Sequence, residues 1–201
     1  MIFTETKLKG AYCIDLEKLE DDRGFFARTW CHREFREKGI SFNLVQSNVS
    51  FNKKRGTLRG MHYQVAPYEE AKLVWCIRGA MYDVIIDLRP YSETFKQWIS
   101  VDLTAENKKL LYIPEGFAHG FLTLMDNTEV FYLMSEFYAP GSARGVRWND
   151  PSFQIHWPAE VTVISEKDRQ YPDFVITQNK VQNLGRDEPC VRPGRGKTHR
   201  S

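Results

Sequence analysis

The chain has 201 residues, of which 42% are hydrophobic and 27% are charged, and its formal net charge is +2. This composition is typical of one compact domain with a sizeable core, and it excludes a disordered or membrane-embedded chain. The small net charge also excludes the dense basic face that dominates nucleic-acid binding. The N-terminus has no basic segment followed by a long apolar run, so we expect a cytoplasmic protein without membrane contact.

A first helix is predicted over residues 32–38, where charged residues recur at helical spacing and Gly39 can end the helix. Downstream, apolar and polar residues alternate in short runs, and turn residues separate the runs. The strands predicted in this way span residues 43–50, 58–64, 72–77, 82–88, 98–103, 110–113, 120–125 and 130–137. Their regular spacing favours an antiparallel sandwich or barrel over alternating strand and helix units.

The segment 82–88 shows the alternation most clearly. Every second residue from Tyr82 to Leu88 is apolar, which predicts a strand buried on one side. The short link around Gly79 joins this segment to the strand before it. We interpret that link as the turn of a tight hairpin.

The end of the chain differs from the rest in composition. A second short helix is predicted at 165–168, where Ser165 can cap the first turn. From about residue 176 the chain is polar and contains glycine, proline and basic residues. We therefore expect one domain over residues 1–175 and a mobile polar tail over residues 176–201.

His62 and Lys72 are the two types of group that the enolisation of a ketone requires. A base must lie near the α-hydrogen, and positive charge must lie near the oxygen on which negative charge develops. A neutral imidazole can take the proton, and the Lys72 ammonium can stabilise the enolate. Two plainer interpretations stay open on the residues alone: His62 as a buried strand histidine bonded to backbone, and Lys72 as a surface charge.

Three further residues have both a chemical and a structural interpretation. His119 lies in a Pro/Gly-bounded loop that runs into a strand, and such loops place polar groups at barrel mouths, although the histidine could equally stabilise the turn. Tyr132 could donate a proton, but its place in an apolar strand favours a core tyrosine. Asp168 could orient His62 through its second ring nitrogen, or it could be a charge at the start of a helix.

A metal site is not expected. His62 is followed by tyrosine and glutamine, and His119 lies far along the chain, so a three-ligand site is hard to assemble. The scattered cysteines are predicted to be free thiols rather than a disulfide framework or zinc site. They are Cys13, Cys31, Cys76 and Cys190. Glycine motifs of the kind that bind phosphate are absent from the sequence. Arg23 and Arg59 therefore remain as candidates to bind a phosphate group.

Several segments match one known family in order and spacing over most of residues 1–175. They are Asp21-Asp-Arg-Gly-Phe-Phe26, Gln46-Ser-Asn48, Leu58-Arg-Gly-Met-His-Tyr-Gln64, Ala71-Lys-Leu-Val74, Thr104-Ala-Glu-Asn107, Ile113-Pro-Glu-Gly-Phe-Ala-His-Gly-Phe121, Arg147-Trp-Asn-Asp-Pro151 and Ser165-Glu-Lys-Asp168. Together they closely resemble the dTDP-4-dehydrorhamnose 3,5-epimerase family. The resemblance implies an all-β fold, a cupin-like double-stranded antiparallel jelly roll with a few short helices. It also implies a homodimer with no metal and no organic cofactor.

The resemblance also implies roles for the reactive residues. His62 looks like the base, and Asp168 looks like its partner. Tyr132 looks like the acid that returns a proton from the opposite side of the sugar ring. Lys72 matches the cation near the C4 ketone, and His119 matches a substrate contact.

Other positions match residues that bind the nucleotide part of the substrate. The diphosphate or nucleotide contacts are Arg23, Gln46, Asn48, Arg59 and Lys167. Tyr138 matches the aromatic residue that stacks on the base. In this family the residue that aligns with Arg23 is commonly supplied by the neighbouring subunit, which would make the dimer part of the site.

Two positions depart from the family's usual pattern. Arg28 stands where members active on the rhamnose precursor usually have glutamate, and Trp75 stands where they usually have arginine. A charge reversal near the nucleotide could change which nucleotide sugar is accepted. It need not change the proton chemistry.

The sequence therefore predicts an isomerase that inverts C3, C5 or both in a nucleotide-linked 4-keto-6-deoxyhexose, with dTDP as the first expectation, in a rhamnose-type pathway. A single-position epimerase or a ketoisomerase is the enzymatic alternative, since both start from the same enolate. A nucleotide-sugar-binding module without turnover and a metal-dependent cupin also stay open.

Overall fold

The computed structural model describes residues 1–175, and the tail predicted over residues 176–201 lies outside the described residues. The described chain is built mainly of strands. They are β1 (Ile2–Glu5), β2 (Tyr12–Asp15), β3 (Leu19–Asp21), β4 (Gly24–Phe26), β5 (Gln46–Asn52), β6 (Thr57–Gln64), β7 (Lys72–Arg78), β8 (Ala80–Asp87), β9 (Trp98–Thr104), β10 (Leu110–Ile113), β11 (Phe117–Thr123), β12 (Thr128–Met134), β13 (Ala143–Gly145) and β14 (Val163–Ile164). The two short helices are α1 (His32–Glu37) and α2 (Glu166–Arg169).

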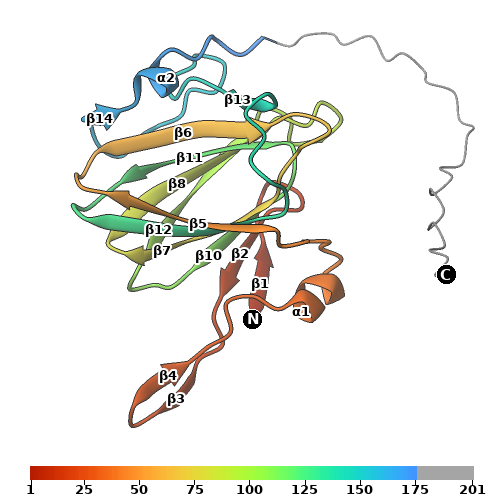
Figure 1. Cartoon of the computed structure of the whole chain (residues 1–201), viewed down its shortest axis with the longest axis vertical. Coiled ribbons are helices and arrows are strands. Elements are labelled where there is room, and N and C mark those ends of the chain that lie inside the picture. The colour runs from red at the N-terminus through yellow and green to blue at the C-terminus, as the bar shows by residue number, and fades with distance from the viewer. Residues whose placement is uncertain (176–201) are drawn as a thin grey trace, which may run out of the picture.

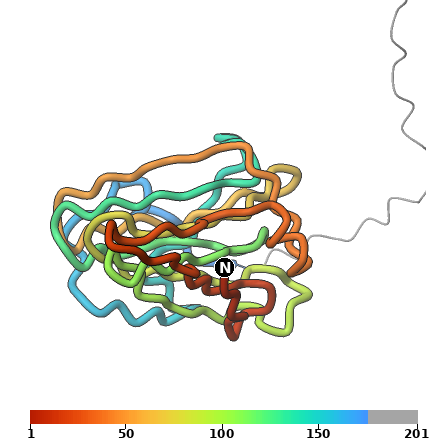
Figure 2. Tube along the Cα trace, turned by 90° about the horizontal axis from the view of Figure 1, so that it is seen from below, coloured from red at the N-terminus to blue at the C-terminus, as the bar shows by residue number. Residues whose placement is uncertain are grey.

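Most of these strands form two facing sheets (Figure 1). The first sheet has the strand order β1-β2-β10-β7-β12-β5. The second has the order β13-β6-β11-β8-β9, with β14 paired in parallel to β6. The strands β3 and β4 form a separate hairpin that projects from the body of the molecule (Figure 1). Viewed from below in Figure 2, the other strands form a flattened barrel.

Apolar side chains fill the space between the two sheets. Val74 and Cys76 of β7, Met81 and Ile85 of β8 and Phe121 of β11 belong to one buried cluster. Alternate residues of a strand point to opposite faces, so each strand contributes every second side chain to this cluster. Burial of one large apolar side chain stabilises the fold by ~1.5–3 kcal/mol. The cluster therefore holds the sheets together and keeps the walls of the cavity between them in place.

Both sheets are also covered on their outer faces. The first is covered by the N-terminal segment and by α1, whose Phe35 is fully buried. The second is covered by residues 146–174, which pack on Val84 and Ile86 of β8. The opposite face of β8 is buried as well, through Ile85. The prediction that this strand is buried on one side only is therefore wrong, because the C-terminal segment forms an additional layer.

The predicted tight hairpin between β7 and β8 is also wrong. β7 pairs with β10 and β12, whereas β8 pairs with β9 and β11, so the two strands belong to different sheets. Gly79 between them has a φ of +77°, and a Cβ there would lie only 2.6 Å from Oγ1 of Thr128. The glycine lets the chain cross sharply from one sheet to the other while passing close to β12.

The other predicted elements exist, mostly with shifted ends. β10 spans its predicted range, whereas β11 begins at Phe117, which places His119 inside the strand rather than in the loop before it. α1 is followed by Gly39, whose φ is +75°. Ser165 caps α2, because its hydroxyl accepts a hydrogen bond from the N–H of Asp168 at 3.1 Å. The strands that were not predicted have two to four residues, too few for an alternating pattern to reveal them.

The two facing antiparallel sheets confirm the predicted all-β fold, a cupin-like double-stranded jelly roll with a few short helices. Within residues 1–175, none of the helices has the length and apolar character needed to cross a membrane. Between the inner faces of the sheets lies a hollow that most of the predicted site residues line.

Candidate active site

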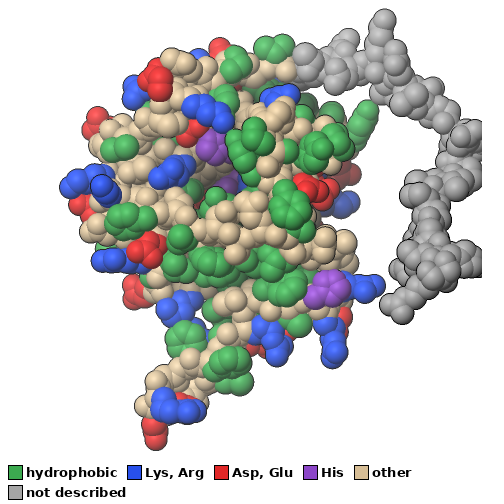
Figure 3. All heavy atoms as spheres, in the orientation of Figure 1, with side chains coloured by type: hydrophobic (Ala, Val, Ile, Leu, Met, Phe, Trp, Pro, Cys, Tyr) green, Lys and Arg blue, Asp and Glu red, His purple; other side chains and the backbone are tan. Residues whose placement is uncertain are grey.

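A cavity of about 600 Å³ lies between the two sheets. Strands β5, β7 and β12 of the first sheet form one wall, and β6, β11 and β13 of the second sheet form the other. Figure 3 shows histidine side chains inside a hollow, with basic side chains around it. His62, Lys72, His119 and Tyr132 line this same cavity, each from a different strand. The fold thus brings together reactive groups that are far apart in the sequence.

His62 and Asp168 form a hydrogen-bonded pair. Nε2 of His62 lies 2.7 Å from Oδ1 of Asp168, and the N–H of Gly60 donates to Oδ2 at 3.3 Å. Burial disfavours the charged form of Asp168, but the hydrogen bond and charge of His62 and the Gly60 N–H hold the pKa of this carboxyl below its usual value. An ionised carboxylate can only accept, so Nε2 carries the hydrogen and Nδ1 keeps a free lone pair that can take a proton.

A second histidine–carboxylate pair lies beside the first. His119 of β11 is directly opposite His62 of β6, and its Nε2 is 2.7 Å from Oδ1 of Asp83 on β8. Burial raises the pKa of Asp83, while the charges of His119 and Lys72 act against this shift. Asp83 was missed in the sequence. A carboxylate within the apolar run of β8 is the signal that could have found it, because such residues are rarely buried unless paired.

Two glycines bring β6 and β11 close together beneath these histidines. A Cβ at Gly120 would lie 2.7 Å from the carbonyl oxygen of Arg59, and one at Gly60 would lie 2.5 Å from Cα of Gly120. Gly60 also has a φ of +136°, where side chains are strained. This close approach therefore requires glycine on both strands, and it sets the spacing of the two histidines.

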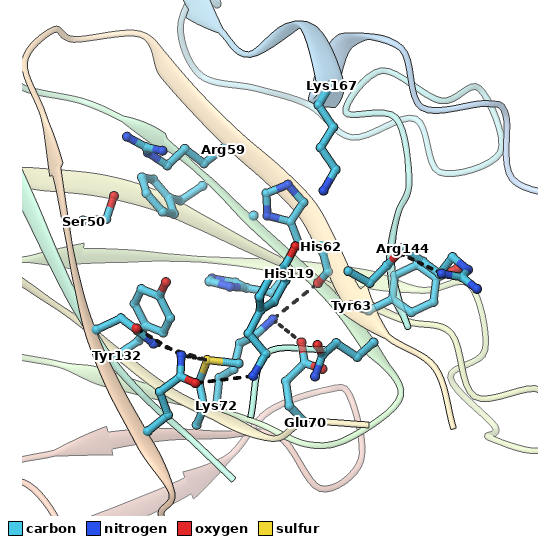
Figure 4. A pocket seen from close by; sticks show the side chains of 18 of the residues that line it. Ser50, Arg59, His62, Tyr63, Glu70, Lys72, His119, Tyr132, Arg144 and Lys167 are labelled. Carbon is cyan, nitrogen blue, oxygen red and sulfur yellow. Dashed lines mark hydrogen bonds and ion pairs between the residues drawn. The ribbon is translucent and has the colours of Figure 1, made fainter. Parts of the chain in front are cut away.

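Lys72 is buried, with 7% of its surface exposed, so its interpretation as a surface charge is wrong. Its Nζ lies 2.8 Å from Oε1 of Glu70 and donates to the carbonyl oxygen of His62 at 3.5 Å (Figure 4). Glu70 was missed in the sequence. The sequence feature that could have predicted this contact is the position of Glu70 two residues before Lys72, since residues with this spacing share one face of an extended chain.

Tyr132 faces the cavity from the sheet opposite His62. Its strand β12 pairs with β5 and β7 of the first sheet, so that Asn48 and Val74 are its cross-strand neighbours. The ring is partly buried against the core between the sheets. Burial raises the pKa of the phenol, and the Arg59 charge acts the other way, so the phenol is protonated at neutral pH. A base and a protonated phenol can thus act on opposite faces of a bound group.

Four predicted substrate-binding residues lie on the same walls or at the rim. On β5, Nε2 of Gln46 donates to Oδ1 of Asn48 at 3.1 Å. On β6, Nε of Arg59 donates to Oδ1 of Asn52 at 2.7 Å, and its terminal nitrogens make no hydrogen bond to the described residues. The side chain of Lys167 extends from α2 toward the cavity (Figure 4). These donors can bind an anion such as a diphosphate.

Tyr138 lies at the rim with its side chain exposed. The backbone around it is held by Gln64, which is buried and was missed in the sequence. Nε2 of Gln64 donates to the carbonyl oxygens of Tyr68 at 2.8 Å and Phe137 at 3.1 Å, and its Oε1 accepts from the N–H of Ala139 at 2.6 Å. These bonds fix the loop that carries the Tyr138 ring.

Arg23 does not line the cavity of its own chain. It lies in the turn between β3 and β4, on the hairpin that projects from the barrel (Figure 1), and it pairs with Asp21. The hairpin exposes large apolar side chains, among them Leu19 and Phe26 at 69% each. The structure thus separates Arg23 from the other predicted site residues within one chain.

The two unusual residues also lie outside the cavity. The ring of Trp75 packs on the outer face of the first sheet, 4.8 Å from that of Phe131. Arg28 forms an ion pair with Glu34 of α1 at 2.7 Å. Neither residue lines the cavity of its own chain, so within one chain their effect on substrate choice would be indirect.

In the part of the chain that the structure describes, no group of three or more histidine, cysteine, aspartate or glutamate side chains could hold a metal ion. The cavity histidines instead each bond a carboxylate. Cys13, Cys31 and Cys76 are free thiols, and Cys190 lies outside the described residues.

The fold and the cavity together place the protein in the class of cupin-like enzymes. These enzymes hold acid–base groups between the two sheets of a jelly roll. The family model described as dTDP-4-dehydrorhamnose 3,5-epimerase matches residues 5–175. The dTDP-4-dehydrorhamnose 3,5-epimerase of Shigella flexneri is 41% identical over 172 residues, which are 85% of this chain and 94% of that relative. The chain therefore belongs to the dTDP-4-dehydrorhamnose 3,5-epimerase family, as its motifs predict.

Solved structures of relatives share the fold. The dTDP-4-dehydrorhamnose 3,5-epimerase of Bacillus anthracis strain Ames, with TDP and PPi bound, has a TM-score of 0.83 at 40% identity and covers 86% of this chain and 99% of its own. ChmJ of Streptomyces bikiniensis, a 3′-monoepimerase in complex with dTDP-quinovose, has a TM-score of 0.77 at 34% identity, covering 84% and 85%. Relatives named for one epimerisation and for two thus share this architecture.

Proposed function

We propose that the protein is a cofactor-independent epimerase that inverts C3, C5 or both in a dTDP-linked 4-keto-6-deoxyhexose, in rhamnose-type deoxysugar biosynthesis. One observation carries this proposal: an imidazole paired with a carboxylate, a buried ammonium and a phenol line a single cavity from two facing sheets. Family membership supports the substrate class.

His62 acts as the base. Its Nδ1 takes the hydrogen from a carbon next to the C4 carbonyl, and the electron pair left behind forms a carbon–carbon double bond while the carbonyl oxygen becomes negative. The Lys72 ammonium donates to this oxygen and stabilises the enolate. Asp168 accepts from Nε2, which orients the ring and offsets the positive charge that His62 gains.

Tyr132 then returns a proton to the opposite face of the same carbon. Because burial raises the pKa of its phenol, the group is a donor and not a competing base. The carbon is inverted, and the sugar keeps its number of hydrogens. The imidazolium then loses its proton to water and the phenolate regains one, which prepares both groups for a second carbon.

The remaining cavity residues bind the rest of the substrate in this proposal. The exposed ring of Tyr138 stacks on the base, and His119, held by Asp83, contacts the sugar. The polar groups that face the nucleotide and its diphosphate are Gln46, Asn48, Arg59 and Lys167. A guanidinium with free terminal nitrogens suits phosphate oxygens because its donors form a planar fork.

We propose further that the protein is a homodimer in which Arg23 completes the neighbouring subunit's cavity. The hairpin that carries Arg23 supports this, because it projects from the barrel (Figure 1) and exposes large apolar side chains. A two-stranded hairpin is at best marginally stable alone, and exposed apolar patches commonly mark interfaces. The proposed domain over residues 1–175 and a cytoplasmic location stay predictions.

Hydrogen exchange tests the proposed reaction directly. Incubation with dTDP-4-keto-6-deoxyglucose in deuterated water should label C3, C5 or both, as read by NMR. His62→Asn should slow labelling by about 10²–10⁴-fold, the usual contribution of a positioned base. His32→Asn is the matched control, since His32 is exposed on α1. Absence of label with every nucleotide 4-ketosugar tried would refute the proposed reaction.

Subunit mixing tests the role of Arg23. Arg23→Ala and His62→Asn homodimers should each be nearly inactive. If Arg23 acts across the interface, a mixed dimer contains one site with both substitutions and one with neither. Equal mixing with random pairing should then restore about a quarter of wild-type activity in a symmetric dimer. A monomer in sedimentation, or no recovery after proven subunit exchange, would exclude this arrangement.

A single-position epimerase is the second candidate, favoured by the structural likeness to a 3′-monoepimerase. NMR of the product decides between the candidates, because inversion at one carbon or two gives different sugars. Nucleotide-sugar binding without any exchange would instead support a binding module.

A further inference from the structure

We propose that Glu70 is a positioning residue of this site, which orients the Lys72 ammonium toward the carbonyl oxygen of the substrate. This proposal rests on the role proposed above for Lys72 and extends it. Glu70 lies outside β7 and outside the motifs that match the family, but its side chain lines the cavity.

The contacts of the Lys72 ammonium carry the proposal. An ammonium has three N–H donors and no acceptor. Nζ forms an ion pair with Oε1 of Glu70 at 2.8 Å, and it donates to the carbonyl oxygen of His62 at 3.5 Å (Figure 4). These two contacts hold Nζ between Glu70 and the backbone of β6, at the wall of the cavity that Lys72 lines. Glu70 therefore sets where the remaining N–H can meet a substrate oxygen.

A second carboxylate, Asp83, competes with Glu70 for the Lys72 charge. Asp83 lies close enough for the Lys72 charge to act on its pKa, and its Oδ2 is buried without a hydrogen-bond partner among the described residues. Lysine has a long, flexible side chain. Without Glu70, Asp83 would be left as the carboxylate that attracts the Lys72 ammonium.

A purely stabilising role does not account for this ion pair. The side chains of Glu70 and Lys72 are only 4% and 9% exposed, and Oε2 of Glu70 has no hydrogen-bond partner among the described residues. Buried ion pairs of this kind contribute little to stability, because desolvation offsets their attraction. A preorganised donor aimed at developing charge does explain a carboxylate at this position.

Kinetics of hydrogen exchange provide the first test. Glu70→Gln should lower kcat by about 10- to 100-fold, since small errors in position cost that much, while KM and the affinity for dTDP stay within about twofold. Adding Glu70→Gln to Lys72→Met should cause no further loss, because Glu70 acts through Lys72. Glu69→Gln, an exposed neighbour with the same charge change, should match wild type. Unchanged kcat in Glu70→Gln, or additive losses in the double variant, would overturn the proposal.

A second test does not depend on turnover. In ¹⁵N-labelled full-length protein, the Lys72 ammonium should give a protected NMR signal, identified by its loss in Lys72→Met. The signal should persist in Glu69→Gln and disappear in Glu70→Gln. Glu70→Asp, which keeps the charge but shortens the side chain, should weaken it. An unchanged signal in Glu70→Gln would refute the positioning role, whereas wild-type protein that exchanges no substrate would refute the proposed reaction instead.

Discussion

Replacing Asp168 with asparagine removes the charge beside His62 while keeping the size of the side chain. In the structure, Oδ1 of Asp168 lies 2.7 Å from Nε2 of His62, and this bond strengthens when the imidazole gains a proton. A hydrogen bond to a charged group contributes about 1.5–3 kcal/mol, and about 1.4 kcal/mol corresponds to a tenfold change in rate. Asp168→Asn should therefore slow the first hydrogen exchange by about 10- to 150-fold.

The assay is deuterium incorporation from solvent into dTDP-4-keto-6-deoxyglucose, followed by NMR. KM should change little, because Asp168 contacts His62 and not the cavity itself. Glu166→Gln is the matched control, since Glu166 lies on the same helix with its carboxylate exposed. If folded Asp168→Asn protein exchanges hydrogen within twofold of wild type, the carboxylate does not assist the base.

The same substitution should change how stability depends on pH. The pKa of Asp168 is lower in the folded protein than its usual value of about 3.9. The ionised carboxylate therefore stabilises the fold above that usual pKa, and the contribution is lost as pH falls through the folded-state pKa. Urea titrations of wild type and Asp168→Asn should differ near neutral pH, and the difference should shrink as the pH falls below the usual carboxyl pKa. A gap that stays constant over this range would contradict the low pKa.

Three further predictions concern single residues. Tyr132→Phe should suppress inversion more than the first exchange, because it removes the returning proton and not the base; equal losses by NMR would contradict this role. Gly120→Ala should lower the free energy of unfolding by ~1–3 kcal/mol, since its Cβ would lie 2.7 Å from the carbonyl oxygen of Arg59; an unchanged urea midpoint would refute this. Burial raises the pKa of Cys76 to about 11, so mass spectrometry should find its thiol alkylated only after unfolding.

The long strands are predictable because alternation is a local property. Segments such as β6 and β12 are recognisable from their own residues. His62 stands out by chemical type, whereas only the resemblance to the family indicated a role for Tyr132 beyond that of a core tyrosine. The change of sheet at Gly79 is not predictable in the same way, because a glycine between two strands fits a hairpin as well as a crossing. Only the pairing of each strand with distant neighbours decides between the two.

The partners of the reactive groups were largely missed for a related reason. Asp83 meets His119 because β8 pairs with β11, and no local pattern contains that register. Gln64 holds the Tyr138 loop across an even longer gap in sequence. Glu70 differs from these two residues, because it lies only two positions from its partner Lys72 and a local pattern could have indicated the pair. Residue type thus predicts which groups can react, whereas strand pairing decides which groups support them.

The proposed proton acceptor, His62, and the proposed proton donor, Tyr132, lie on different sheets of the molecule. The gap between them is therefore set by whatever keeps the layers apart, and not by any bond either residue makes. A distant substitution that changes the volume of the apolar core between the sheets would move His62 and Tyr132 relative to each other, while the contacts of each residue stay the same. Such an enzyme would still exchange hydrogen between solvent and the sugar, but it would release the sugar with its original configuration.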